Sequence, residues 1–163
     1  MALALDQRIL ELCQAAALAH SYRRKGKTVV LTNGVFDLLH VGHVAYLERA
    51  RAMGDVLFVG VNSDASTTSL KGSARPLVPA EERALLVSYL RPVDYVVVFH
   101  EATADCLLQA LRPHVYVKGG DYSLETLPEA QTARMVGAAV RLVPVEAEQS
   151  TTRLVERILS RYR

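Results

Sequence analysis

The stretch TNGVFDLLHVGH, residues 32–43, decides the fold of this chain. It follows the apolar, β-branched run Thr28-Val29-Val30-Leu31 and precedes a helical pattern at residues 44–50. A strand therefore leads into a glycine-containing turn, and His40 and His43 fall where the next helix starts. A helix N-terminus offers unpaired N–H groups and the positive end of the helix dipole, and two histidines add hydrogen-bond donors. The stretch predicts a nucleotide-phosphate site at the start of this helix.

Two other interpretations of the histidine pair stay open on spacing alone. A His-x-x-His spacing is often incidental, and it also suits a pair of zinc ligands. The strand, turn and helix start around the pair are the context that a phosphate site requires, and they favour phosphate. Gly42, between the histidines, lets a ligand approach the backbone. The stretch also resembles the HxGH nucleotidyltransferase superfamily, in which both histidines contact the triphosphate.

Apolar runs alternate with helical patterns along the whole chain. The expected strands lie at residues 28–32, 56–61, 95–99, 115–117 and 140–144. The expected helices lie at residues 5–22, 43–53, 80–90, 103–111, 128–136 and 151–161, and residues 62–79 are expected to form a polar loop. The strands are apolar on both faces, which is typical of a parallel sheet covered by helices.

This pattern predicts an α/β fold, a single Rossmann-like doubly wound domain with a five-stranded parallel sheet. The domain would span residues 28–163 and follow an N-terminal helical extension at residues 1–27. Ligands of such sheets bind beyond the carboxyl ends of the strands. The loops after the first, second, fourth and fifth strands are therefore expected to open on the ligand-binding edge.

Composition and charge narrow the class of protein. The 163 residues are 50% hydrophobic and 22% charged, as in an ordinary soluble globular domain, and a net charge of +2 is too small to indicate nucleic-acid binding. Cys13 and Cys106 lack metal-ligand spacing and are expected to be buried, reduced thiols. The N-terminus lacks a signal-peptide pattern, and no apolar run approaches the roughly 18 residues of a membrane span. We expect a cytoplasmic protein that binds neither nucleic acid nor membrane.

The loops of the expected ligand-binding edge carry further candidate residues. Asn62 and Asp64 follow the second strand, and Lys71 and Arg75 lie in a polar segment that can close over phosphates, with plain solvated positions as the alternative. In the first loop, Asp37 either orders the turn or holds Mg²⁺ through water, and the structural role is favoured.

Two later loops add a lysine, glycines and hydroxyl groups. Lys118, Gly119 and Asp121 follow the fourth strand, where glycine permits close approach of a nucleotide and a tight turn is the alternative. The run Ser150-Thr151-Thr152 opens the last helix. A helix N-cap explains one of these hydroxyls, and three in a row indicate a second anion site.

The segments TNGVFDLLHVGH, GVNSDAS, LKGSARP, VKGGDY and STT together resemble the D-glycero-β-D-manno-heptose 1-phosphate adenylyltransferases. The resemblance covers about residues 28–158. Val35 stands where that family often has cysteine, which argues against a catalytic thiol. Leu127-Pro128-Glu129 and Gln149 also depart from the family pattern, and they bear on the acceptor and on the nucleotide contacts. The chain shows no sugar-kinase domain, which predicts the stand-alone form of the enzyme.

The resemblance implies transfer of AMP from ATP to D-glycero-β-D-manno-heptose 1-phosphate, with ADP-heptose and pyrophosphate as products. It implies Mg²⁺ bound mainly through the ATP phosphates, with no direct protein ligand. The implied catalytic residues are His40, His43 and Lys71. The implied nucleotide-binding residues are Asn33, Gly34, Val35, Phe36, His40, Gly42, His43, Lys118, Gly119, Asp121, Ser150, Thr151 and Thr152. The implied residues for acceptor binding or loop closure are Asn62, Asp64 and Arg75.

Family members commonly form homodimers, so a homodimer is expected; alternatively, Leu5, Ile9 and Leu12 simply pack the N-terminal helix onto its own domain. Two other functions stay open. One is a cytidylyltransferase that acts on glycerol 3-phosphate or another small phosphate or phosphonate. The other is a nucleotide-binding regulator without catalysis.

Overall fold

The computed structural model describes residues 7–120, 122–144 and 151–162. The strands are β1 (Val29–Gly34), β2 (Val56–Asn62), β3 (Tyr95–Phe99), β4 (Val115–Gly119) and β5 (Ala139–Val143). The helices are α1 (Leu12–Arg24), α2 (Val41–Arg51), α3 (Asp64–Lys71), α4 (Ala80–Ser88), α5 (Asp105–Leu111), α6 (Ala130–Val136) and α7 (Thr151–Tyr162).

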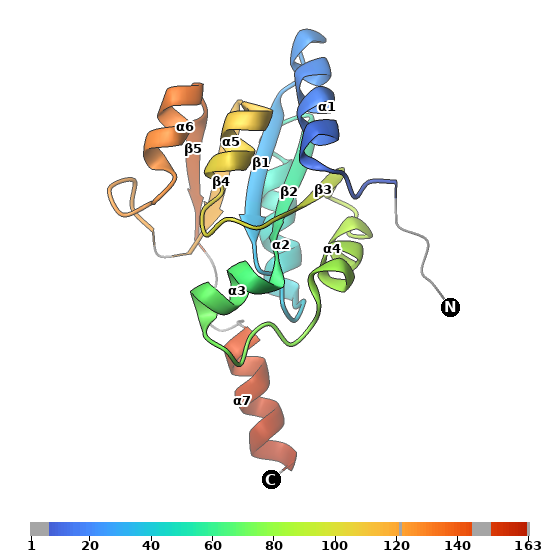
Figure 1. The fold of residues 1–163 in the computed structure, drawn as a ribbon, viewed down its shortest axis with the longest axis vertical. Helices are drawn as coiled ribbons and strands as arrows, with labels where there is room; N and C mark the ends of the chain where they lie inside the picture. The colour runs from blue at the N-terminus through green and yellow to red at the C-terminus, as the bar shows by residue number, and fades with distance from the viewer. Residues whose placement is uncertain (1–6, 121, 145–150, 163) are drawn as a thin grey trace.

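The five strands form one parallel sheet in the order β3-β2-β1-β4-β5 (Figure 1). The chain builds outward from β1 to β3 on one side and then crosses to β4 and β5 on the other. The order therefore reverses between β1 and β4, and doubly wound sheets bind ligands at such a switch point. The predicted Rossmann-like α/β fold with five parallel strands is confirmed.

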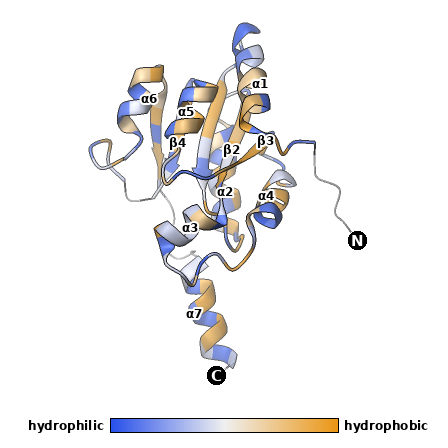
Figure 2. Cartoon of the chain, in the orientation of Figure 1, coloured by the Kyte–Doolittle hydropathy of each residue, from blue (hydrophilic) through white to orange (hydrophobic). Residues whose placement is uncertain are grey.

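Helices cover both faces of the sheet, because alternate strand residues point to opposite sides. Val29 and Leu31 of β1 belong to a core cluster that includes residues of α1, α5 and α6, whereas Val30 belongs to a second cluster with residues of α2 and α4. Both faces of β2 are buried along its whole length, and β2 is strongly hydrophobic in Figure 2. The continuous apolar strand in the sequence is thus explained by burial on two sides.

The N-terminal region differs from the predicted helix at residues 5–22. The helix α1 begins only at Leu12, and Ile9 pairs with Val96 beside the edge strand β3. The N–H of Leu10 donates to the carbonyl of Val96 at 2.9 Å. An edge strand offers unpaired backbone groups, and this segment satisfies them at the expense of a longer helix. Ile9 and Leu12 pack against the core clusters, so both contact their own domain.

The expected loop at residues 62–79 contains the helix α3, which the sequence analysis missed. Ser63 caps it: the Ser63 hydroxyl accepts a hydrogen bond from the Ser66 N–H at 3.2 Å. Asp64 in the first turn is favoured by the helix dipole. Ser-Asp is a helix-start signal, but Ser, Thr and Gly in this stretch also indicate a loop. Lys71 therefore sits at the end of a helix rather than in an open loop.

The helices α3 and α7 lie at the carboxyl edge of the sheet, at the bottom of Figure 1. The helix α7 extends away from the rest of the domain and has no fully buried residue. Among the described helices, none is long and apolar enough to cross a membrane.

Candidate functional site

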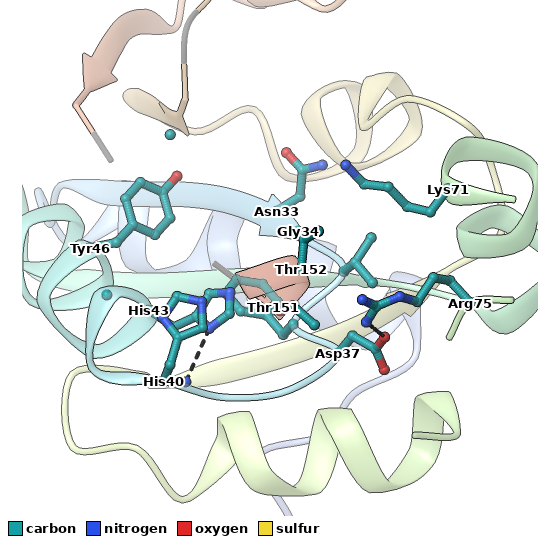
Figure 3. A pocket seen from close by; sticks show the side chains of 14 residues that line it. Asn33, Gly34, Asp37, His40, His43, Tyr46, Lys71, Arg75, Thr151 and Thr152 are labelled. Carbon is teal, nitrogen blue, oxygen red and sulfur yellow. Dashed lines mark hydrogen bonds and ion pairs between the residues drawn. The ribbon is translucent and has the colours of Figure 1, made fainter. Parts of the chain in front are cut away.

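A cavity of about 440 Å³ opens at the carboxyl edge of the sheet, beyond the end of β1 (Figure 3). It collects residues from the end of β1 and the loop after it, from α2, from α3 and the segment after it, and from β4 and α7. Its lining consists of Asn33, Gly34, Val35, Phe36, Asp37, His40, Gly42, His43, Tyr46, Lys71, Arg75, Gly119, Thr151 and Thr152. All of these except Tyr46 were singled out from the sequence, so the fold brings the predicted residues of four separate segments into one cavity.

The two histidines stack at the start of α2. His40 is the residue immediately before the helix, and its ring centroid lies 3.9 Å from that of His43. The backbone N–H of His40 donates to Nδ1 of His43 at 3.4 Å. In neutral His43 the proton therefore resides on Nε2, which stays available as a donor to a ligand. The Phe36 ring also packs against the His43 ring, with centroids 5.3 Å apart.

Both histidines favour the neutral form in the free protein. Burial, together with the nearby His40, lowers the pKa of His43 from 6.5 to about 4. Burial also lowers the pKa of His40. At neutral pH the pair is a set of uncharged N–H donors, so the histidines become positively charged only when a proton binds together with an anion.

The backbone before the histidines takes an unusual path. Phe36 is a non-glycine residue with a positive φ of 52°. Its ring folds back against Gly34, where an added Cβ would lie 3.0 Å from Phe36 Cε2. Glycine at this position therefore makes room for the turn that delivers the histidines to the cavity.

Asp37 fastens the segment that carries Arg75 to the first loop. Its carboxylate accepts hydrogen bonds from Arg75 Nη1 at 2.7 Å and from the N–H groups of Leu77 and Val78 at 2.8 and 3.0 Å. Burial acts to raise the pKa of Asp37, but these hydrogen bonds outweigh it and lower the pKa overall. The favoured ordering role of Asp37 matches these contacts. Within the described ranges, no group of three or more His, Cys, Asp or Glu side chains could hold a metal ion.

A buried arginine missed in the sequence analysis supports the same loops. The Arg83 side chain is fully buried; it donates from Nε to the Val78 carbonyl and from Nη2 to Asp64, both at 2.7 Å, and from Nη1 to the Val35 carbonyl. The sequence did contain a signal for this burial. Arg83 stands at helical spacing from the apolar residues Ala80, Ala84 and Val87, and it shares their buried face of α4.

Tyr46 is the lining residue that the sequence analysis missed, because an aromatic residue in a helical pattern is usually interpreted as part of the hydrophobic core. Its hydroxyl donates to the Val117 carbonyl at 3.1 Å and also contacts the Thr32 hydroxyl. Burial raises the pKa of Tyr46, so the phenol keeps its proton. The residue joins α2 to the ends of β1 and β4.

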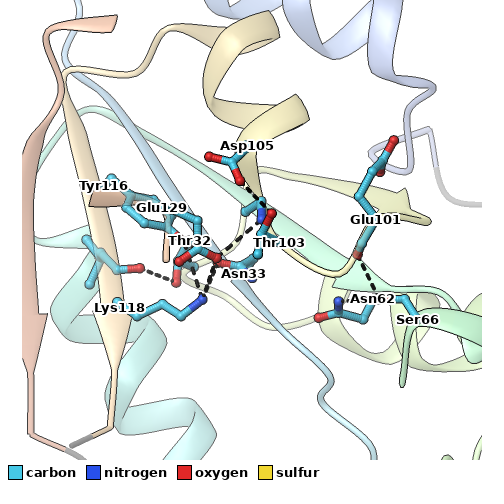
Figure 4. A network of polar contacts seen from close by, with 12 residues as sticks. Thr32, Asn33, Asn62, Ser66, Glu101, Thr103, Asp105, Tyr116, Lys118 and Glu129 are labelled. Carbon is cyan, nitrogen blue, oxygen red and sulfur yellow. Dashed lines mark hydrogen bonds and ion pairs between the residues drawn. The ribbon is translucent and has the colours of Figure 1, made fainter. Parts of the chain in front are cut away.

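A network of polar side chains lies beside the cavity, on the α5 and α6 side of the sheet (Figure 4). Lys118 Nζ contacts Asn33 Oδ1 at 3.3 Å, the Tyr116 hydroxyl at 3.4 Å and Glu129 Oε1 at 3.0 Å. Tyr116 also donates to Asn33 Oδ1, at 2.7 Å. An ammonium group has three N–H donors, and three partners engage those of Lys118 here. Lys118 is absent from the cavity lining, although a nucleotide contact was predicted for it.

The remaining predicted residues have other positions. Asn62 is buried and donates to Ser66 Oγ at 2.9 Å, and Asp64 pairs with Arg83, so neither lines the cavity. Asp121 and Ser150 lie outside the described residues. Thr151 donates from Oγ1 to the Leu38 carbonyl at 3.4 Å, which ties the start of α7 to the first loop.

Comparison with known proteins assigns the family. Residues 31–158 match the sequence profile of the cytidylyltransferase-like family, which is more than half of the chain. The chain belongs to the cytidylyltransferase-like family. The matched range contains every residue of the cavity lining, so the cavity lies wholly within the family domain.

Relatives with solved structures and with curated sequences agree with this assignment. The chain is 53% identical over 140 residues to the bifunctional protein HldE of Syntrophotalea carbinolica, covering 86% of this chain and 29% of that protein. It is 47% identical over 157 residues to the bifunctional protein HldE of Geobacter sulfurreducens, covering 96% of this chain and 32% of that protein. The chain thus spans about a third of the length of the curated relatives it matches.

Two crystal structures share the fold. One is the lipopolysaccharide core biosynthesis protein of Thermoplasma volcanium, with a TM-score of 0.62 and 29% identity over 74% of this chain and 98% of that chain. The other is pantoate-β-alanine ligase of Francisella tularensis in complex with β-γ ATP and β-alanine, with a TM-score of 0.65 and 13% identity over 90% of this chain and 69% of that chain. The second likeness concerns the fold alone.

We predict that Arg83→Met strongly destabilises this cytidylyltransferase-like domain. The change leaves the carbonyls of Val35 and Val78 without their donor, and each such loss costs about 1–3 kcal/mol in free energy of unfolding. The Asp64 carboxylate, whose side chain is 50% exposed, adds less because water can solvate it. Urea denaturation measures the loss. Arg91→Met is the matched control: its side chain is 90% exposed and pairs with Glu48, so a change of about 0–1 kcal/mol is expected. Equal, small effects of both substitutions would contradict the bracing role of Arg83.

Proposed function

We propose that this chain transfers AMP from ATP to D-glycero-β-D-manno-heptose 1-phosphate and releases ADP-heptose and pyrophosphate. The observation that carries the proposal is the single cavity that joins the stacked histidines of the HxGH motif to Lys71, Arg75 and the threonines of α7. Such a set of N–H and O–H donors and cations suits a polyphosphate. The segments quoted for the heptose 1-phosphate adenylyltransferases supply these lining residues, and relatives about half identical to this chain are named bifunctional protein HldE.

The reaction would proceed by in-line displacement at the α-phosphorus of ATP. A phosphate oxygen of the sugar 1-phosphate attacks, the new P–O bond forms, and the bond to the bridging oxygen breaks as pyrophosphate leaves with the electron pair. The sugar phosphate is ionised at neutral pH, so no protein base and no covalent nucleophile is required. Catalysis is then positioning and stabilisation of charge.

The described residues have distinct parts in that scheme. His40 and His43 donate to the triphosphate and to the charge that develops in the transition state, and Lys71 neutralises further phosphate charge. Thr151, at the start of α7, offers a helix N-terminus to a phosphate. Arg75 lines the cavity and is held by Asp37. Asn62 and Asp64 do not line the cavity. They would affect acceptor binding indirectly, by ordering the loops beside it.

The lining fits a magnesium ion that arrives with the nucleotide. Asp37 is the carboxylate among the described lining residues, and its oxygens already accept three hydrogen bonds. Mg²⁺ bound to the ATP phosphates would neutralise the triphosphate, and Asp37 would reach it only through water. The protein side of the site then supplies donors rather than metal ligands.

Turnover assays test the proposal directly. Pyrophosphate release is measured with ATP and with CTP, each against a panel that includes D-glycero-β-D-manno-heptose 1-phosphate and glycerol 3-phosphate. ATP with the heptose phosphate is the pair expected to react. Preference for CTP and glycerol 3-phosphate would replace the proposal with cytidylyl transfer, and nucleotide binding without turnover would replace it with a regulatory role.

The homodimer and the cytoplasmic location belong to the same proposal. ATP and a sugar phosphate are substrates of the cytoplasm, and the active site is proposed to form mainly within each subunit. Light scattering at several concentrations tests the dimer. A constant mass near 17.9 kDa, the mass of one chain, would reject it.

We predict that His40→Ala and His43→Ala each fold normally and lose most of their turnover. A hydrogen bond to a charged phosphate is worth roughly 1.5–3 kcal/mol, which corresponds to about a 10- to 150-fold loss in kcat/KM. His20→Ala, at an exposed position of α1, is the matched control and should keep its activity. Near-normal turnover of both cavity variants would remove the histidines from the mechanism.

Lys71→Ala is predicted to lower turnover with little change in melting temperature. Lys71 is exposed and ends α3, and no described residue forms a hydrogen bond or ion pair with its side chain, so its removal leaves no buried partner behind. Activity and thermal melting are measured on the same preparation, with the exposed Lys25→Ala as control. A large fall in melting temperature would mean that the lysine is structural instead.

The pH dependence of triphosphate affinity is predicted to follow His43. The pKa of His43 is about 4 in the free protein, and a bound triphosphate raises it by favouring the charged imidazolium. Affinity is therefore highest at low pH and declines as pH rises from about 4 through the higher pKa of the complex. Titration calorimetry at constant magnesium occupancy measures this, and His43→Gln, assayed in parallel, subtracts the titration of ATP itself. Parallel profiles for both proteins would show that His43 stays neutral when it donates.

A further inference from the structure

The amide group of Asn33 is held in one orientation by its neighbours. Its Oδ1 faces two donors, the Tyr116 hydroxyl at 2.7 Å and Lys118 Nζ at 3.3 Å. An ammonium group can only donate, so the flipped amide would set an NH₂ group against an NH₃⁺ group. The oxygen of Asn33 must therefore face this network (Figure 4), and the NH₂ group must face away from it.

The network that fixes Asn33 is itself fixed. Glu129, whose side chain is 2% exposed, accepts from Lys118 Nζ at 3.0 Å and from the Ala104 N–H at 3.2 Å through the same oxygen. Burial, and next the Glu129 charge, raise the pKa of Tyr116, so its phenol keeps the proton that it donates to Asn33. Two residues of β4 thus donate to one oxygen of Asn33, and Glu129, just before α6, holds one of them in place.

The NH₂ group of Asn33 faces a second donor across the cavity. Figure 3 shows the amide nitrogen of Asn33 and the ammonium nitrogen of Lys71 turned toward one another. Both residues line the cavity. No described residue accepts a hydrogen bond from Asn33 Nδ2, and none pairs with the Lys71 side chain. Two donors that line one cavity, and that have no partner among the described residues, can bind one electronegative atom together, and a lysine favours an anionic one.

We propose that Asn33 Nδ2 and Lys71 Nζ form a subsite for the phosphate of the acceptor sugar phosphate, and that Lys118 acts only by orienting Asn33. The assignment rests on the proposed function, and it identifies the phosphate that Lys71 contacts. In an in-line transfer the attacking oxygen and the leaving pyrophosphate lie on opposite sides of the α-phosphorus. The histidines start α2 on one face of the sheet, whereas Asn33 contacts the network on the other face, and Figure 3 shows the two pairs on different sides of the cavity.

Steady-state kinetics distinguish the acceptor phosphate from the triphosphate. In Asn33→Ala, the KM for the sugar 1-phosphate is expected to rise on the order of 10- to 100-fold, as for loss of a hydrogen bond to a charged group. The KM for ATP should stay within about twofold, since the histidines still bind it. Asn33→Asp should raise the acceptor KM further, because it replaces a donor with a negative charge. A rise in the KM for ATP instead would assign Asn33 to the triphosphate and overturn the subsite.

A double-mutant cycle tests the orienting role of Lys118. Lys118→Met alone should raise the acceptor KM, because the amide of Asn33 can then flip, whereas Asn33→Ala/Lys118→Met should be no worse than Asn33→Ala. A further rise in the double variant would mean that Lys118 contacts the ligand directly. The cycle is repeated in a Glu129→Gln background, in which Lys118→Met leaves no unpaired buried charge. Tyr116→Phe removes the other donor to Asn33 without changing charge, and Lys25→Met is the matched surface control.

A binding measurement separates failure of the subsite from failure of the proposed function. Calorimetry follows D-glycero-β-D-manno-heptose 1-phosphate, and separately inorganic phosphate, as each binds the wild-type chain saturated with a non-hydrolysable ATP analogue. Binding that is lost in Asn33→Ala supports the subsite even if no substrate pair is turned over. Normal turnover combined with unchanged acceptor binding and unchanged acceptor KM in Asn33→Ala would overturn the subsite while the proposed function stands.

Discussion

A buried guanidinium and a buried carboxylate hold the loops of the cavity against one another. Arg83 joins the Val35 carbonyl to the Val78 carbonyl, and Asp37 accepts from the N–H groups of Leu77 and Val78. Both connections link the segment before the histidines to the segment after Lys71. The charges are compensated by hydrogen bonds, and each would be costly if its partner moved. The donors of the cavity are thereby held in place before any ligand binds, which is what electrostatic catalysis requires.

The electrostatic design of the cavity combines neutral and charged donors. Burial keeps the histidines uncharged in the free protein, so the stacked rings do not repel one another across 3.9 Å. Lys71 is exposed and charged, and it ends a helix whose loop is tied down by Asp37. The parts closest to the backbone are therefore preorganised, while Lys71 is a cation that no described residue holds in place. A phosphate in the cavity would therefore contact fixed dipoles near the backbone and a mobile charge on Lys71.

The sequence predicted those features that depend on local pattern. The apolar strands, the HxGH turn and the meeting of four loops at one edge follow from burial on two faces and from parallel strand order. The features that the sequence analysis missed depend on tertiary contacts. Arg83 reads as an ordinary surface residue until its face of α4 is seen to be buried, and Ile9 leaves its expected helix because the edge of β3 needs hydrogen bonds. The partner of Ile9 lies far along the chain, so no local pattern indicates it, whereas the burial of Arg83 is indicated only by the helical spacing of its apolar neighbours.

Lys71 and Lys118 have identical side chains, but they differ in burial and therefore in role. Each lies at or near the end of its element and stands next to glycine, and the sequence predicted ligand contacts for both. Lys118 is surrounded by Asn33, Tyr116 and Glu129, so every proton it can donate is engaged within the protein. Lys71 has no such partner among the described residues, and its charge is left for a ligand. The buried lysine selects the orientation of Asn33, and that orientation decides which atom meets the exposed lysine across the cavity. A charge that never touches a ligand can thus determine which ligand atoms the cavity accepts.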